Sequence, residues 1–204
     1  YLNEVIVKTD FYTQAVKGVK EVKPEVPVKA PKYSPARLKL HQEIIDKLKD
    51  SKIMDADEIK KLLPEYDPLH PELVHAESRY IRTKLIRTKI ESLVGKADKS
   101  VVFNIGVPGA GKTTVLGPAS KYYDIIHETT GNHVATHKNL LESLRKKGFQ
   151  VDVNLVAIPL NQSLQNQAWR RIHKERSIPD KIVENIYPKT YRTAFELMRL
   201  ADNW

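Results

Sequence analysis

Apolar residues recur with a helical period in two stretches of the first half of the chain. Residues 36–50 place their apolar side chains along one approximate face, and residues 76–94 do so against a largely basic opposite face. Spacings of three and four residues between apolar positions are typical of an amphipathic helix. We therefore predict a helix in each stretch. The apolar stripe of the second helix consists of Ile81, Leu85, Ile86, Ile90 and Leu93.

From residue 100 onward, short apolar runs alternate with helical patterns. Strands are predicted at residues 101–105, 122–126 and 151–158, and residues 52–54 are a candidate for a further short strand. Helices are predicted at residues 136–147, 161–175, 179–186 and 190–201, with Thr136 as the cap of the first. Such alternation is typical of an α/β fold, in which helices cover a parallel sheet. We predict this fold class.

The first 36 residues differ from this pattern. They are rich in proline, valine and lysine and have no helical period, which is typical of an extended linker. We predict an arm over residues 1–36 and one domain over residues 37–204. Because the first residue is Tyr1 and not methionine, we also expect the chain to be part of a longer protein.

Composition narrows the classes of protein that fit. The chain has 204 residues, a formal net charge of +9 and no cysteine, which excludes disulfides and thiolate metal sites. We see no apolar run near the ~20 residues of a membrane span. The positive charge fits an anionic partner such as nucleotide phosphates, an anionic substrate or nucleic acid. A merely soluble basic surface would give the same charge.

A glycine-rich motif follows the strand predicted at residues 101–105. Residues 106–113 read G-V-P-G-A-G-K-T, which fits the pattern of a phosphate-binding loop, or P-loop. Its backbone N–H groups can turn toward phosphate oxygens, its lysine can bridge the β- and γ-phosphates, and its threonine hydroxyl can bind a metal ion. We predict that ATP or GTP binds here with Mg²⁺, and that Thr113 is a metal ligand. The predicted nucleotide contacts are Gly106, Pro108, Gly109, Ala110, Gly111, Lys112, Thr113 and Thr114.

Two carboxylates, Asp55 and Asp57, follow the candidate strand at residues 52–54. The carboxyl ends of strands are where open α/β sheets bind ligands, and a kinase needs a carboxylate to orient and deprotonate the attacking hydroxyl. An acidic first turn of a helix would explain the same two residues without catalysis. From these residues alone, both interpretations stay open.

Other polar residues in the second half are candidates for substrate contacts. Glu128 and Thr130 follow the strand predicted at residues 122–126 and either contact a substrate or form an ordinary turn. Arg170 and Arg176 lie on or just after the helix predicted at residues 161–175. Arginines in that place either neutralise phosphate charge during transfer or belong to a basic helix surface.

Together these segments resemble the zeta toxin family of P-loop kinases over roughly residues 51–200. The P-loop at residues 106–114 is the first segment. The stretch I-M-D-A-D-E-I-K at residues 53–60 is similar to the family's D-x-D-x-[FL]-[RK] motif, and I-H-E-T-T at residues 126–130 is similar to its E-G-T loop. The last segment runs from V-A-I-P at residues 156–159 through Arg170 to R-S-I-P at residues 176–179.

The resemblance implies transfer of the γ-phosphate to a hydroxyl of a nucleotide-like acceptor, with UDP-N-acetylglucosamine as the expected acceptor. It implies that Lys112 and Thr113 hold the phosphates and Mg²⁺. It also implies that Asp57 is the base for the acceptor hydroxyl and that Arg170 and Arg176 clamp the phosphates. The implied acceptor contacts are Asp55, Glu128 and Thr130.

The chain departs from the family in three ways. Thr129 stands where the family's loop has glycine, and a glutamate expected in the preceding helix has no clear counterpart near Leu85. In the family the D-x-D segment follows the P-loop, whereas here residues 51–95 precede it. Either the gene is rearranged, or these residues are joined differently from the written order. The second alternative predicts chain breaks near residues 50–51, 95–96 and 120–121.

We therefore expect a kinase that acts as a toxin in the cytoplasm and is delivered as part of a larger protein. NAD or a nucleic-acid end is the alternative acceptor, and the basic helix at residues 76–94 fits the latter. A nucleotide-dependent binding or switch module with weak hydrolysis is the alternative outside enzymes. We expect the arm at residues 1–36 to bind a partner, such as a neutralising antitoxin, an immunity protein or a carrier.

Overall fold

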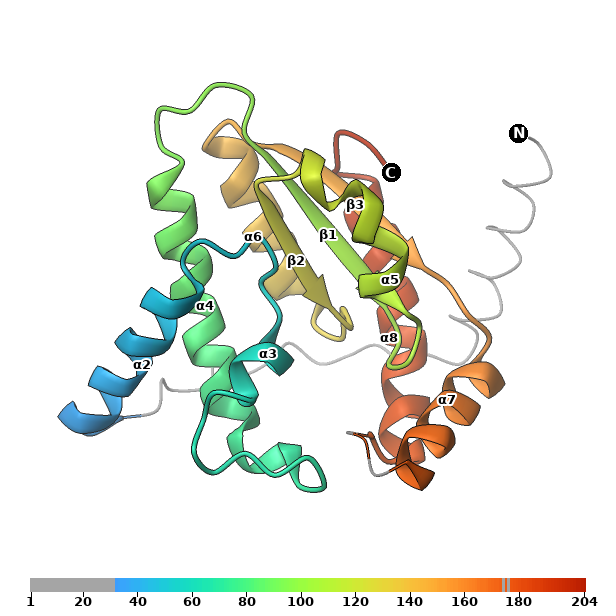
Figure 1. The fold of residues 1–204 in the computed structure, drawn as a ribbon. Coiled ribbons are helices and arrows are strands. Elements are labelled where there is room, and N and C mark those ends of the chain that lie inside the picture. The colour runs from blue at the N-terminus through green and yellow to red at the C-terminus, as the bar shows by residue number, and fades with distance from the viewer. Residues whose placement is uncertain (1–31, 174, 176) are drawn as a thin grey trace, which may run out of the picture.

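The computed structural model describes residues 32–173, 175 and 177–204 (Figure 1). Most of the predicted arm and the predicted phosphate clamp Arg176 lie outside these residues. Within the described chain, three strands form one parallel sheet in the order β2-β1-β3. The strands are β1 (Ser100–Gly106), β2 (Ile125–Thr129) and β3 (Gln150–Val156). The predicted α/β class is confirmed.

The two faces of the sheet are covered unequally. Side chains alternate along a strand, so Val101, Phe103 and Ile105 of β1 enter the main core, whereas Val102 packs against Leu116 on the other face. The main core is covered by helices α4 (His75–Ser92), α6 (Val134–Lys146) and α8 (Asp180–Met198) (Figure 1). The other face carries the short helix α5 (Lys112–Leu116) and the 3-10 helix η2 (Gly117–Tyr122), and Asn203 and Trp204 lie against it near the C-terminus.

Several elements differ from their predicted bounds. The strand predicted at residues 151–158 ends at Val156, and the helix predicted at residues 161–175 ends at Ile172. The strand predicted at residues 122–126 begins at Ile125, because Pro118 starts the 3-10 helix η2, which continues through Tyr122. The helices predicted at residues 179–186 and 190–201 are one helix, α8, with Pro188 inside it. Side chains on both sides of Pro188, including Val183 and Tyr191, are buried, and this packing outweighs the backbone hydrogen bond that proline removes.

The remaining helices frame the P-loop end of the sheet. Helix α2 (Pro35–Leu48) is capped by Ser34, and Arg37 joins it to Glu77 of α4 at 2.6 Å. Helix α7 (Leu160–Ile172) follows β3. Helix α6 begins at Val134, so the predicted cap Thr136 lies inside its first turn. The described part of the chain has no helix that is long and apolar enough to cross a membrane.

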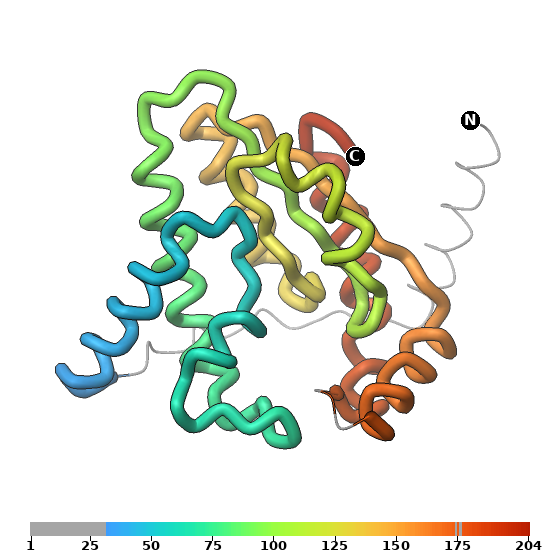
Figure 2. The backbone as a smooth tube through the Cα atoms, in the orientation of Figure 1, coloured from blue at the N-terminus to red at the C-terminus, as the bar shows by residue number. Residues whose placement is uncertain are grey.

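The segment before α3 (Ala56–Lys60) lies beside the sheet edge. Ile53 forms an isolated parallel bridge with Ile126 of β2, and the N–H of Met54 donates to the Ile126 carbonyl at 2.8 Å. The candidate strand at residues 52–54 is thus reduced to a single bridge. This bridge still brings the carboxyl end of the segment beside the carboxyl end of β2, as the course of the backbone shows (Figure 2).

The second alternative for the order of the chain concerns three points, and local backbone hydrogen bonds span each of them. Hydrogen bonds cross them from Ser51 N–H to the Leu48 carbonyl at 2.9 Å and from Lys96 N–H to the Leu93 carbonyl at 3.1 Å. A third runs from Tyr123 N–H to the Ser120 carbonyl at 3.3 Å. The segment at residues 53–60, which precedes the P-loop in the written sequence, lies beside β2 at the sheet edge.

Candidate phosphate-binding site

The loop between β1 and α5 has a backbone that requires glycine. Gly109 and Gly111 have φ angles of 78° and 75°, a region that other residues rarely adopt. A Cβ atom on Gly106 would lie 2.9 Å from the Val156 carbonyl oxygen. Alternating backbone conformations of this kind turn successive N–H groups toward one point and form a concave anion site. The loop therefore fits a phosphate group.

Lys112 is close to most of the charged residues that the sequence predicted for the site. Its ammonium group donates to the Gly106 carbonyl at 3.2 Å. Burial lowers the pKa of Lys112; the nearby carboxylates of Glu128, Asp55 and Asp57 act in the opposite direction, and Arg170 lowers it further. Five residues from four separate segments are thus close enough to interact electrostatically. They are the residues that the sequence named as catalytic or acceptor-binding, apart from Thr130 and Arg176.

Glu128 lies against the P-loop, inside β2 and not in the loop after it. The Thr113 hydroxyl donates to Oε2 of Glu128 at 3.1 Å, and the Asn104 amide donates to Oε1 at 3.2 Å. Burial and the charge of Asp55 raise the pKa of Glu128, while Lys112 and these two hydrogen bonds oppose the rise. A carboxylate paired with the P-loop threonine fits the oxygen-ligand preference of Mg²⁺. In the sequence, the signal for Glu128 was an acidic residue close after the apolar run of a predicted strand.

Asn104 was not singled out from the sequence, although it connects several parts of this site. It is fully buried in β1. Its amide nitrogen also donates to the Lys112 carbonyl at 3.1 Å, and its oxygen accepts from the Asn154 amide at 2.8 Å. Buried polar groups of this kind need partners, and here the partners are the P-loop helix and two strands. A lone amide in an otherwise apolar strand was the signal that could have found it.

Asp55 and Asp57 have different local roles. Asp55 caps α3, since its Oδ1 accepts from the N–H of Asp57 at 3.0 Å. Asp57 is in the first turn of α3, and its Oδ1 lies 3.1 Å from the ammonium group of Lys60, whose side chain is only 2% exposed. The two aspartates therefore do form the acidic start of a helix, as the interpretation without catalysis expected. The Asp57 side chain is nevertheless 32% exposed. Capping and a contact to an acceptor are compatible here.

Arg82 is a member of the site that sequence reasoning placed on a solvated basic face. Its guanidinium donates to the Glu128 backbone carbonyl at 3.3 Å. Burial lowers the pKa of Arg82 to about 10, helped by Arg79 and opposed by Asp55 and Asp57. The helix pattern did not separate this arginine from its exposed neighbours, because the packing of α4 against β2 decides which side of the helix is covered.

The two other predicted contacts are set by neighbouring helices. The Thr130 carbonyl accepts from the Thr190 hydroxyl at 2.5 Å, which ties the loop after β2 to α8. The side chain of Thr130 is half-buried, and so is that of Arg170 on α7. Arg170 lies close enough to Lys112 to lower its pKa, whereas the contact of Thr130 runs to Thr190 of α8.

A buried histidine behind β2 gives a test of the packing around the site. The ring of His137 is 5% exposed and its Nε2 lies 2.7 Å from the Thr129 hydroxyl. Burial and the charge of Arg82 lower the pKa of His137 to about 3. The unfolded chain, with a histidine pKa near 6.5, then binds more protons than the folded protein in mildly acidic solution.

We therefore expect the free energy of unfolding to fall as the pH is lowered from about 7.5 to about 5, because folding must keep His137 neutral. Urea denaturation at both pH values measures the loss. His137→Gln should reduce the loss, whereas His70→Gln, which changes a side chain that is 62% exposed, should leave it as in the unchanged protein. Equal losses in all three proteins would contradict the assignment.

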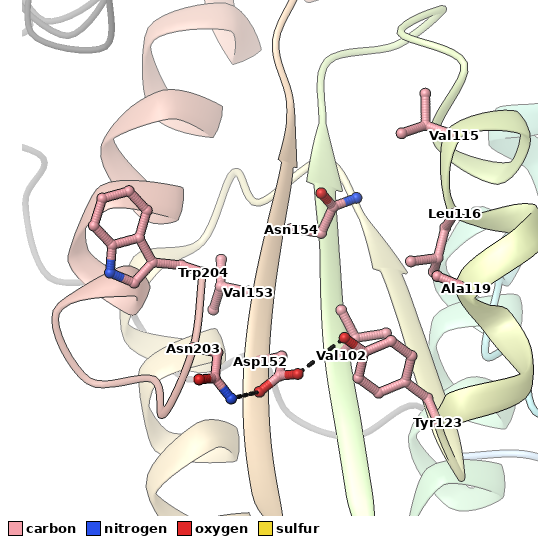
Figure 3. A pocket seen from close by; sticks show the side chains of 10 residues that line it. All are labelled: Val102, Val115, Leu116, Ala119, Tyr123, Asp152, Val153, Asn154, Asn203 and Trp204. Atoms are coloured by element: carbon pink, nitrogen blue, oxygen red, sulfur yellow. Dashed lines mark hydrogen bonds between the residues drawn. The ribbon is translucent and has the colours of Figure 1, made fainter. Parts of the chain in front are cut away.

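A separate cavity of about 280 Å³ lies on the thinly covered face of the sheet (Figure 3). Asp152 of β3 lies at its wall and accepts from the Tyr123 hydroxyl and from the Asn203 amide, both at 2.9 Å. Burial and Asp152 raise the pKa of Tyr123 to about 12. The residues that line this cavity include none of the predicted site residues. The phosphate site is therefore distinct from it.

Comparison with known proteins bears on the second half of the chain. The family model described as zeta toxin matches residues 118–201, which cover β2, α6, β3, α7 and α8. Over these residues the match agrees with the resemblance that the sequence motifs indicated. No curated protein matches the chain. In the described ranges, no group of three or more histidine, cysteine, aspartate or glutamate residues is arranged to hold a metal ion.

Proposed function

From a zeta toxin domain over residues 118–201, we propose that the chain is a kinase. It transfers the γ-phosphoryl group of ATP or GTP to a hydroxyl of a nucleotide-like acceptor. UDP-N-acetylglucosamine is the acceptor that we propose, and the biological role is that of a toxin that depletes a precursor of its target cell. One observation carries the proposal: the P-loop lysine, Lys112, lies within the electrostatic reach of Asp57, Glu128 and Arg170.

On the donor side, the P-loop N–H groups and Lys112 would hold the β- and γ-phosphates. Thr113 and Glu128 would hold Mg²⁺, which supplies charge neutralisation on the phosphate oxygens when bound. Asn104 keeps the Glu128 carboxylate turned toward Thr113 through its hydrogen bond at 3.2 Å. The protein's contribution to this half of the reaction is the placement of charge, since phosphoryl transfer depends chiefly on positioning and electrostatic stabilisation.

On the acceptor side, Asp57 would orient the attacking hydroxyl and accept its proton. Lys60 lies 3.1 Å from Oδ1 of Asp57 and so helps to fix the orientation of this carboxylate. Arg170 would neutralise charge that develops on the transferred group. We assign the same task to Arg176, which lies outside the described residues.

Mass spectrometry of products tests the proposal. The protein is incubated with Mg-ATP or Mg-GTP and a mixture of UDP-N-acetylglucosamine, NAD and a short oligonucleotide, with Lys112→Ala as the control. A gain of one phosphate on the nucleotide sugar, absent with Lys112→Ala, is the expected result. A gain on NAD or the oligonucleotide would keep the kinase and replace the acceptor. Hydrolysis of ATP without any phosphorylated product would overturn the kinase assignment.

Glu128→Gln tests the metal side of the site. The amide keeps the size of the side chain but loses its charge, so the Mg²⁺ concentration that gives half-maximal activity should rise about tenfold or more, as for other groups that support a metal site. Glu142→Gln, on the exposed surface of α6, is the matched control. An unchanged Mg²⁺ requirement would remove Glu128 from the metal site and return it to the acceptor side.

A further inference from the structure

One face of α7 is bonded to the outside of the P-loop. The Ser163 hydroxyl donates to the Pro108 carbonyl at 2.7 Å, and the Asn166 amide donates to the Gly109 carbonyl at 2.8 Å. Ser163 is fully buried. Because residues three and four apart share a helix face, these two side chains and the next turn of α7 approach the loop together. The loop therefore has side-chain partners on the side away from its anion site.

These two hydrogen bonds affect the side that faces the phosphate. A peptide group points its carbonyl and its N–H in opposite directions. When the carbonyls of Pro108 and Gly109 are held by α7, the Gly109 N–H is turned away from that helix. The Ala110 N–H donates to the Val107 carbonyl inside the loop at 3.1 Å. A carbonyl left without these partners would be free to turn toward the anion, where its negative end repels phosphate. The hydroxyl and the amide thus favour the anion-binding shape of the loop.

Gln167 extends this contact to the chain that follows α7. Its side chain is fully buried, and its Oε1 accepts from the N–H of Ile178 at 2.8 Å. A Cβ atom on Gly109 would lie 3.0 Å from Nε2 of Gln167, and this nitrogen has no hydrogen-bond partner within the described chain. Gln167 thus packs against the P-loop glycine while it holds residue 178. The P-loop and the segment after α7 share one buried side chain.

The beginning of α7 is itself fixed. The Tyr191 hydroxyl of α8 accepts from the Ile158 N–H at 3.0 Å and donates to the Ile158 carbonyl at 2.8 Å. Val107 and Ala110 of the P-loop pack in the same small core as Tyr191. A helix whose beginning is anchored beside the core that the P-loop shares is suited to hold that loop in place.

We propose that Ser163 and Asn166 are positioning residues for the binding of a nucleoside triphosphate. They hold the P-loop in its phosphate-binding shape, and they do so from the helix that also carries Arg170. Affinity for the triphosphate group then depends on α7 as well as on the P-loop. This inference rests on the proposed function only in that it takes the P-loop to bind nucleotide.

Calorimetric titration with Mg-ATP and with inorganic tripolyphosphate tests the inference on the full chain. Ser163→Ala and Asn166→Ala should each weaken the binding of both ligands about tenfold, which corresponds to the loss of one buried hydrogen bond. Ser163→Thr keeps the hydroxyl and should restore affinity. Gln165→Ala, on the exposed side of α7, should bind as the unchanged protein does. The melting temperature without ligand shows whether each variant is folded.

Three outcomes separate this inference from others. Unchanged affinity in folded Ser163→Ala and Asn166→Ala overturns it. Weakened binding in Gln165→Ala as well would also overturn it, because the effect would then belong to the helix in general and not to its P-loop contacts. If the unchanged protein binds neither Mg-ATP nor tripolyphosphate, the proposed function fails first and the inference falls with it.

Discussion

Lys112→Ala is expected to lower the rate of phosphoryl transfer by a factor on the order of 10²–10³ or more, the effect of removing one preorganised charge from developing negative charge. Lys112 is the P-loop cation that would bridge the phosphates, and its pKa is lowered mainly by burial. A desolvated ammonium interacts more strongly with phosphate than an exposed one. The measurement is the initial rate of product formation at saturating Mg-ATP and acceptor.

Lys146→Ala is the matched control, because it removes the same charge from an exposed position on α6. It should leave the rate within a factor of about two, as expected for a surface substitution. A Lys112→Ala protein that is folded and retains most of its activity would contradict the assignment of the P-loop as the donor site. A loss seen equally in both variants would point to net charge and not to the P-loop.

Asp57→Asn is expected to lower the rate at saturating substrate by a factor of about 10²–10⁴, the range for loss of a general base. The amide keeps the size of the side chain and cannot accept the proton of the hydroxyl. Binding of Mg-ATP should change little, because the proposed role of Asp57 is on the acceptor. Steady-state rates together with nucleotide titration separate the two effects.

Glu58→Gln makes the same chemical change at the neighbouring position of α3, where the side chain is 58% exposed and pairs with Lys61. Its activity should be close to that of the unchanged protein. If Asp57→Asn is fully active, Asp57 has no part in the mechanism. If Asp57→Asn loses nucleotide affinity as well as rate, its charge supports the donor site and not the acceptor.

Features that depend on neighbouring residues in the chain could be predicted from the sequence. The P-loop is one, because its glycines and Lys112 act through local backbone geometry and fixed spacing. The amphipathic helices α2 and α4 are others, since their period is visible in the sequence and the structure has them within two residues of the predicted bounds. The parallel sheet followed from the alternation of elements.

Features that depend on packing between distant segments could not be predicted in this way. Arg82 looks like any other basic residue of α4 until β2 covers it. Ser163 and Asn166 look like an ordinary polar helix face until the P-loop lies against it. Glu128 was singled out from the sequence, but the register of β2 decides which partner it meets. That register is set by the pairing of β2 with β1, and the sequence of β2 alone does not contain it.

The bridge between Ile53 and Ile126 has a consequence for the order in which the candidate site assembles during synthesis. Residues 53–60 leave the ribosome before the P-loop and before β2, so Asp57 exists in the growing chain ahead of the surface that will position it. Only after β2 has emerged and paired with β1 can the segment dock at the sheet edge. The acidic residue and the phosphate loop are therefore kept apart until the last strand between them has folded. A nascent chain that stops short of β2 cannot assemble the pair.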